Sequence, residues 1–195
     1  MRKTDKRLLG IAAIAASLGL FVAAQLPGVA SGGASLADYI GVADARKSAS
    51  TVSVFDGFIP QREYAAIRAR RSSYDATADI LRAIAAVNGT SKTLVFPAGT
   101  YYVGEVVFSG HDYAVDTAGV TFRQKRGLTG DREIHPIITF PQDASNIRLG
   151  DVRLDGNIAT DRDEYSPGIA VISAKNITIG NVHGEDIRGD VLYTY

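Results

Sequence analysis

The amino-acid sequence predicts an all-β protein, a single-stranded parallel β-helix whose N-terminal end is capped by an α-helix. Residues 144–152 recur thirty residues later as residues 174–182, with seven of the nine positions matching in type. From Thr93 onwards short β-type runs follow one another, and no helical pattern of ten or more residues separates them. Self-similarity at a period of about 20 to 50 residues indicates a solenoid, in which each unit buries its apolar face against its neighbours.

Within the repeat, apolar side chains alternate with polar ones. Ile147 and Leu149 alternate with Asn146 and Arg148, and the second copy keeps this pattern. A period of two places the apolar set on one face of a strand and the polar set on the other. Asn146 and Asn176 fall at equivalent turn positions and are expected to stack as an asparagine ladder. Two ordinary hairpins in a sandwich are the alternative, which the fixed period and the recurring turn disfavour.

The other elements follow in chain order. A short strand is expected at Val52–Phe55 and a short helix at Gln61–Arg70, where Pro60 suits the first turn. Beyond Thr93, the β-type runs are mostly separated by segments that carry Gly, Asp or Pro. These runs are Leu94–Phe96, Tyr101–Val103, Val106–Phe108, Tyr113–Val115, Val120–Phe122 and Ile137–Phe140.

The clearest helical pattern covers Ala78–Val87. Apolar residues recur there at the spacing of one helix face, namely Ile80, Ile84 and Val87. Thr77 or Asp75 can cap the start of this helix, and Asn88-Gly89 supplies its end. The sequence therefore predicts an amphipathic helix that lies on an apolar surface.

Residues 1–30 have the pattern of a secretory signal peptide. Basic residues at positions 2–7 precede a largely apolar run from Leu8 to Ala24, and small residues lead up to Ala30. We expect cleavage after Ala30, with Ala24 as the second choice. An uncleaved anchor is the alternative, which the short apolar run disfavours. The protein is therefore expected to be secreted or periplasmic without a stable membrane anchor, and residues 31–50, rich in Ala, Ser and Gly, to be a flexible linker.

Composition excludes several classes of function. The 195 residues are enough for one domain. A composition of 46% hydrophobic and 22% charged residues excludes a disordered protein and a polytopic membrane protein. The absence of cysteine excludes disulfides, thiolate metal sites and cysteine nucleophiles. A formal net charge of zero, without a long basic run, disfavours a nucleic-acid partner.

Two segments carry a resemblance to a known superfamily. Residues 74–80, Tyr-Asp-Ala-Thr-Ala-Asp-Ile, precede residues 94–103, Leu-Val-Phe-Pro-Ala-Gly-Thr-Tyr-Tyr-Val. This arrangement resembles the opening of the pectate-lyase-like superfamily, whose members are right-handed parallel β-helices with an N-terminal capping helix. The resemblance covers residues 51–195 and implies a cap followed by about four to five coils. Because full members are longer, it also implies the N-terminal portion of an incomplete solenoid.

The resemblance implies a carbohydrate-active protein. Members of the superfamily include polygalacturonase-like hydrolases, polysaccharide lyases, alginate epimerases and tailspikes, so the fold alone does not choose among them. We expect action on an acidic polysaccharide, by cleavage or C5 epimerisation. The family's complete catalytic motifs, Gly-His-Gly with Arg-Ile-Lys or Asp-Pro-His-Glu, are not present in this sequence. A non-catalytic glycan-binding or structural module is therefore the alternative, marked by tyrosines such as Tyr165, Tyr193 and Tyr195.

Three carboxylates are the candidate catalytic residues. Asp155 opens an Asp-Gly-Asn segment that resembles the end of a coil in related hydrolases and epimerases, and Asp186 and Asp190 lie about one coil later. Hydrolases need two carboxyl groups, whereas lyases and epimerases need a base that removes a carbon-bound proton. Asp155 and Glu185 are one repeat apart, so we expect them to stack at about the 4.8 Å spacing of strands.

The candidate substrate-binding residues are Arg188, Tyr165 and His183. Arg188 would attract an acidic substrate. The alternative for the candidate carboxylates is that they are solvated turn residues, because turns favour Asp, and for His183 that it is a turn histidine with neither role. The sequence carries no zinc-ligand spacing, so no metal site and no cofactor are expected. A calcium site would draw on the carboxylates of residues 161, 163 and 164.

Overall fold

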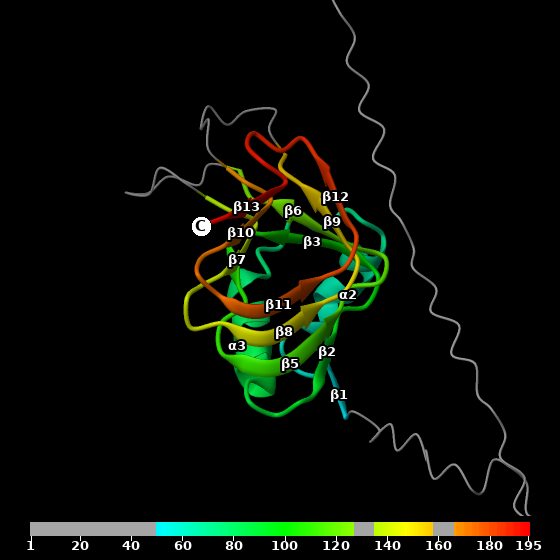
Figure 1. The fold of residues 1–195 in the computed structure, drawn as a ribbon. Helices are drawn as coiled ribbons and strands as arrows, with labels where there is room; N and C mark the ends of the chain where they lie inside the picture. The colour runs from blue at the N-terminus through cyan, green and yellow to red at the C-terminus, as the bar shows by residue number, and fades with distance from the viewer. Residues whose placement is uncertain (1–49, 127–134, 158–165) are drawn as a thin grey trace, which may run out of the picture. The chain divides into compact units, whose positions relative to one another are not determined.

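The computed structural model describes residues 50–126, 135–157 and 166–195, which all lie within one compact unit (Figure 1). The expected signal peptide at 1–30 and nearly all of the expected linker at 31–50 lie outside these residues. In the described part of the chain, no helix has the length and apolar character needed to cross a membrane.

The unit is mostly β, as predicted. A 3-10 turn and two helices precede most of the strands: η1 (Gln61–Glu63), α2 (Tyr64–Arg68) and α3 (Thr77–Val87). The strands are β1 (Thr51–Ser53), β2 (Thr93–Val95), β3 (Gly99–Val103), β4 (Val106–Val107), β5 (His111–Asp116), β6 (Val120–Gln124), β7 (Ile138–Phe140), β8 (Ser145–Leu149), β9 (Val152–Asp155), β10 (Ile169–Val171), β11 (Lys175–Ile179), β12 (Val182–Glu185) and β13 (Leu192–Thr194).

These strands form three parallel sheets, which we name by their strand order. Sheet A is β1-β2-β5-β8-β11, sheet B is β3-β6-β9-β12, and sheet C is β4-β7-β10-β13. From β2 onwards the chain therefore visits A, B and C in turn, and each strand pairs with the strand one circuit earlier or later (Figure 1). Every pairing between these strands is parallel.

The apolar side chains that alternate along the strands meet in one core. In sheet B, Tyr101 pairs in register with Phe122, which pairs with Leu154, and all three side chains are buried. Phe108 and Phe140 stack with ring centroids 5.5 Å apart. Because buried aromatic rings remove a large apolar area from water, these stacks contribute strongly to the stability of the unit.

The first two predicted elements differ from the prediction, and both end earlier than expected. The first strand ends at Ser53, because the carboxylate of Asp56 accepts the Ser53 N–H (2.9 Å) and closes a turn. The helix expected at Gln61–Arg70 becomes η1 and α2, which ends at Arg68. Arg70 takes a left-handed conformation with φ 58°, and such a residue stops a right-handed helix.

The predicted amphipathic helix is confirmed as α3, which begins one residue earlier than expected. Its buried residues include Ile80, Ile84 and Val87, and it contacts β1, β2 and β4. The prediction of Thr77 or Asp75 as the cap is wrong, because Ala76 occupies the N-cap position and has no side chain that can accept a hydrogen bond. Asp75 Oδ1 instead accepts the backbone N–H (3.1 Å) and the hydroxyl (2.6 Å) of Thr77, the first residue of α3. The apolar face of α3 thus covers the first strands of sheets A and C.

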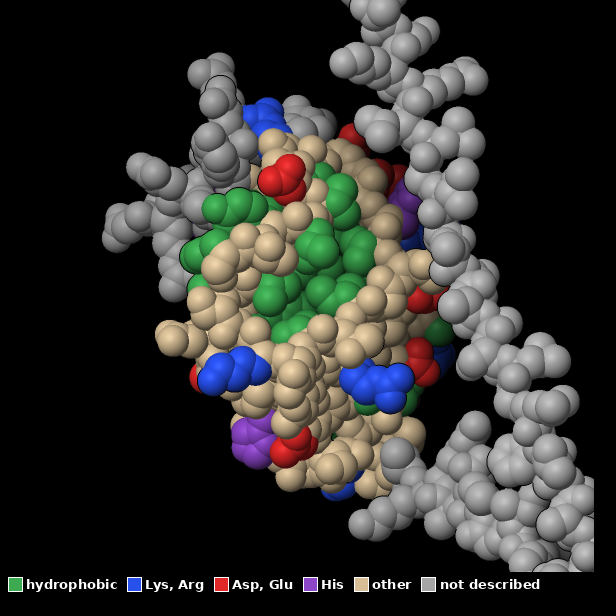
Figure 2. Space-filling model, viewed as in Figure 1, with side chains coloured by type: hydrophobic (Ala, Val, Ile, Leu, Met, Phe, Trp, Pro, Cys, Tyr) green, Lys and Arg blue, Asp and Glu red, His purple; other side chains and the backbone are tan. Residues whose placement is uncertain are grey.

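Among the described strands, β11, β12 and β13 have neighbours in their sheets on one side only. Ile177 pairs with Ile147 and Ile179 with Leu149, yet the residues on β11 are half-buried and those on β8 are buried. Figure 2 shows the resulting hydrophobic area, seen between these three strands. Full burial of a strand in this unit therefore needs cover on both sides, from a second strand or, at β3 and β4, from the helices α2 and α3.

The asparagine ladder is confirmed and has an additional rung. Asn176 Nδ2 donates to Asn146 Oδ1 (3.0 Å), and Asn146 Nδ2 donates to Asp112 Oδ1 (2.8 Å). All three residues have φ between 53° and 58°, a left-handed conformation that Asn and Asp tolerate better than most residues. The other oxygen of Asp112 lies 2.9 Å from His111 Nδ1. Asp112 therefore ends the ladder as a charged acceptor.

Acid is expected to weaken this ladder. Hydrogen bonds from His111 and then Asn146 hold the pKa of Asp112 below its usual value. A carboxyl whose pKa is lower in the folded protein stabilises the fold above the unfolded pKa of about 3.9, and this stabilisation is lost as pH falls through the folded value. We expect Asp112→Asn to unfold at a temperature that depends less on pH below about pH 5 than that of the wild type. Asp143→Asn, which alters an exposed carboxylate, is the control. If the unfolding temperatures of Asp112→Asn and of the wild type depend equally on pH, the charge of Asp112 does not stabilise the ladder.

Candidate functional site

The outer face of sheet B carries three of the side chains that the sequence singled out, namely Asp155, His183 and Glu185. Because side chains alternate along each strand, the outward positions line up as two columns across β3, β6, β9 and β12. Column 1 is Thr100, Thr121, Arg153 and His183, and column 2 is Tyr102, Arg123, Asp155 and Glu185, each residue being paired in register with the next.

Asp155 is the most constrained of the predicted catalytic residues. Its side chain is only 7% exposed, and its Oδ2 accepts a hydrogen bond from Arg123 Nε at 2.5 Å. Its Oδ1 accepts the backbone N–H of Asn157 at 2.9 Å. Both oxygens are therefore engaged, and the carboxylate fixes the direction of Arg123 and the turn after β9. The expected stacking is confirmed, since Asp155 and Glu185 are direct partners in register.

The other two predicted carboxylates lie in the connection between β12 and β13. Asp186 is exposed and has φ 50°, and its carbonyl oxygen lies against Gly156 in the turn below. Asp190 is exposed at the other end of the connection, where its carbonyl oxygen accepts the N–H of Gly168 (2.9 Å). Arg188 lies between them and is half-buried. The turns after β9 and β12 are thus stacked, with the backbone of Asp186 against Gly156.

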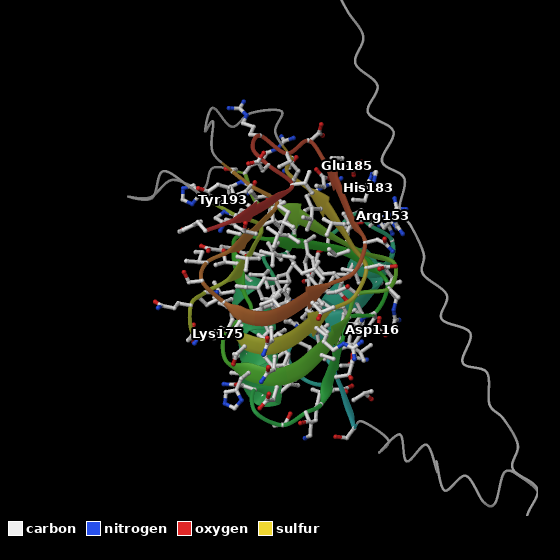
Figure 3. The ribbon with its side chains drawn as sticks, in the orientation of Figure 1. Asp116, Arg153, Lys175, His183, Glu185 and Tyr193 are labelled. Carbon is white, nitrogen blue, oxygen red and sulfur yellow. The ribbon has the colours of Figure 1, made fainter. Side chains whose placement is uncertain are left out.

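His183 lies on column 1, beside Arg153 and two residues before Glu185. Figure 3 shows the side chains of Arg153, His183 and Glu185 along this side of the molecule. A hollow of about 370 Å³ opens here, lined by residues that include Asp151, Arg153, Asn181 and His183. The predicted binding residue His183 therefore borders a concave part of the face.

Some predicted residues lie outside the described part of the chain. They are Tyr165 and the three acidic residues of the suggested calcium site, Asp161, Asp163 and Glu164. Among the residues that the structure describes, no group of three or more His, Asp and Glu is arranged to hold a metal ion.

A second hollow, of about 360 Å³, lies at the β3 end of the same face. We call it the arginine hollow, and it is lined by Arg71, Ser72, Ser73, Tyr102, Arg123, Arg126 and Asn157. The sequence reasoning did not single out any of its arginines. Tyr102 and Arg123 pair in register at outward positions of neighbouring strands. The number of residues between them is smaller than the thirty-residue repeat, so the repeat did not reveal this pairing.

Comparison of the chain with models of known families, with curated proteins and with solved structures finds no match. What the protein does must therefore be inferred from the arrangement of its own residues, above all those on the outer face of sheet B.

Proposed function

We propose that the three sheets form a right-handed parallel β-helix of the pectate-lyase-like type, and that this protein, once secreted, binds an acidic polysaccharide along the outer face of sheet B. The regular passage through sheets A, B and C supports the solenoid. Parallel strands in one sheet are joined by right-handed crossovers in nearly all proteins, which supports the hand.

The observation that carries the proposed ligand is the order of charges on columns 1 and 2. The β3 end of column 2 holds Tyr102 and Arg123, and the β12 end holds Asp155 and Glu185. Arg153 stands on the outer face next to them. A polymer that runs across the strands would meet a new outward side chain at about every 4.8 Å, so its carboxylates could contact Arg123 in column 2 and Arg153 in column 1.

The same face and the connection after β12 have groups suited to cleavage or C5 epimerisation. Both reactions begin when a base takes the C5 proton while a cation stabilises the negative charge on the uronate. In cleavage the electron pair forms a C4–C5 double bond and expels the glycosidic oxygen, which takes up a proton, and in epimerisation C5 is reprotonated from the opposite side. The exposed groups His183, Glu185, Asp186 and Asp190 are the candidate bases. Asp155, with both oxygens engaged, would position Arg123.

Non-catalytic glycan binding is the second candidate function. It is favoured by the engagement of Asp155 and by two exposed aromatic rings, Tyr193 and Tyr195, whose centroids are 5.1 Å apart. Exposed aromatic rings offer apolar faces on which a sugar ring can stack. A binding module would retain the polymer and leave its length unchanged.

The test is electrophoresis of the full chain through gels that contain polygalacturonate, alginate or neutral dextran. We expect the acidic polymers alone to retard the protein, and Arg153→Ala to weaken the retardation by about tenfold in affinity. Arg148→Ala removes an exposed arginine from sheet A and serves as the matched control. Retardation by dextran, or equal losses in both variants, would overturn the proposal. Unsaturated chain ends or altered stereochemistry at C5 would indicate an enzyme, and an unchanged polymer a binding module.

A further inference from the structure

We propose that the arginine hollow is a carboxylate-binding subsite, which takes the acidic group of one uronate at the β3 end of the outer face of sheet B. The inference rests on the proposed function and assigns the residues that recognise the acid.

The hollow lies where sheet B gives way to the segment before α3. Asp75 forms a parallel bridge with Tyr102, and the Tyr102 carbonyl oxygen accepts the N–H of Ala76 at 3.0 Å. The segment that contains Arg71 and Ser72 is therefore held beside β3 and forms one wall of the hollow. Asn157, in the turn after β9, belongs to the lining as well.

Tyr102 presents a hydrogen-bond donor to the hollow. Its hydroxyl oxygen accepts the backbone N–H of Arg126 at 3.0 Å, so its own O–H hydrogen stays available. Within the described part of the chain, no acceptor is hydrogen-bonded to this hydroxyl. A ligand that offers an oxygen acceptor would satisfy it.

Two of the arginines are each fixed by a hydrogen bond from Nε, at one edge of the guanidinium. Arg126 Nε donates to Asn157 Oδ1 (3.2 Å), and Arg123 Nε donates to Asp155 Oδ2 (2.5 Å). In each guanidinium the terminal nitrogens are left to bind a ligand. Fixing Nε in advance reduces the conformational entropy that ligand binding would otherwise cost, and the planar fork of Arg matches the two oxygens of a carboxylate.

The charges around the hollow do not cancel. Asp155 balances Arg123, and Asp75 balances the neighbouring Lys125 at 2.8 Å. Over residues 50–126, 135–157 and 166–195, neither Arg71 nor Arg126 forms an ion pair with a carboxylate. Among the described residues that line the hollow there is no carboxylate, so an anion would meet hydrogen-bond donors and the uncompensated charges of Arg71 and Arg126 there.

The experiment is a nuclear magnetic resonance titration of the full chain with glucuronate, and in parallel with glucose and inorganic sulfate. We expect glucuronate to shift the amide signals of Arg126 and Asn157, and Arg71→Ala and Arg126→Ala each to weaken its binding by about tenfold. Tyr102→Phe should weaken it about threefold, because only a neutral donor is lost. Arg148→Ala and Thr178→Val, which alter exposed residues on sheet A, should leave the affinity unchanged.

The outcomes separate this inference from the proposed function. If the wild type is retarded by polygalacturonate, and the hollow variants bind glucuronate as the control variants do, the subsite is overturned and the proposed function stands. If glucuronate binding depends on Arg71 and Arg126 but polygalacturonate does not retard the chain, the subsite is supported and the polymer-binding function fails. Sulfate that binds as tightly as glucuronate, or glucose that shifts the same signals, would overturn carboxylate recognition. Because Arg71 and Arg126 are exposed, the variants should unfold at the wild-type temperature.

Discussion

Replacing Arg123 with alanine is expected to lower the free energy of unfolding by about 2–3 kcal/mol, because Asp155 would be left without its ion pair in a buried position. The side chain of Asp155 is 7% exposed and that of Arg123 is 42% exposed. Loss of one partner from a fully buried pair costs about 3–5 kcal/mol, and water that reaches the Arg123 side reduces this cost.

A double-mutant cycle measured by urea unfolding checks the origin of this effect. Arg123→Ala with Asp155→Ala should be less destabilised than the sum of the single variants, because the second change removes the unpaired charge. Arg148→Ala controls for the loss of an exposed arginine. If Arg123→Ala costs no more than Arg148→Ala, the ion pair does not hold the turn after β9 as inferred.

Gly156→Ala is expected to have an effect of similar size, about 2–3 kcal/mol, for a steric reason. A Cβ at Gly156 would overlap the carbonyl oxygen of Asp186, and the Gly156 N–H already donates to Glu185 O at 2.9 Å. The backbones of the two turns are therefore too close for a methyl group. To relieve the overlap, the connection after β12 must move away from sheet B and take Asp186 with it.

Gly189→Ala is the matched control, because it lies in the same connection and its Cβ would meet its nearest neighbours at 3.4–3.6 Å, an ordinary contact. We expect urea unfolding to show a large loss for Gly156→Ala and a small one for Gly189→Ala. Amide signals of Asp186 and Ile187 should shift in the first variant alone. Equal stabilities would mean that the two turns do not stack as described.

Much of the mostly β architecture could be predicted from the sequence because the strongest signals are local. The alternation of Ile147 and Leu149 with polar residues predicts one buried and one exposed strand face, and β8 has both. The period of Ile80, Ile84 and Val87 predicts the buried face of α3. These patterns depend on neighbouring residues, so no knowledge of the distant chain is needed.

Which side chains meet on neighbouring strands depends on how many residues separate those strands along the chain. Such contacts could be predicted only where this number equals the visible repeat. Asn146 and Asn176 are thirty residues apart, whereas Asp112 precedes Asn146 by 34. The sequence therefore revealed the stacking of Asp155 with Glu185, which follows the thirty-residue spacing. Arg123 lies 32 residues before Asp155, and this spacing matches no repeat that the sequence displays.

The polarity of the ladder restricts how this chain can be lengthened. Each amide donates toward the N-terminal side, and the charged Asp112 receives the last donation. An inserted repeat with its own asparagine would fit between Asn146 and Asn176, or beyond Asn176, since every donor would still find an oxygen. An asparagine placed before Asp112 would have to donate to its carboxylate, against the direction of the ladder, because the carboxylate has no hydrogen to donate. The ladder can therefore be continued in its present direction on the Asn176 side, whereas Asp112 reverses it.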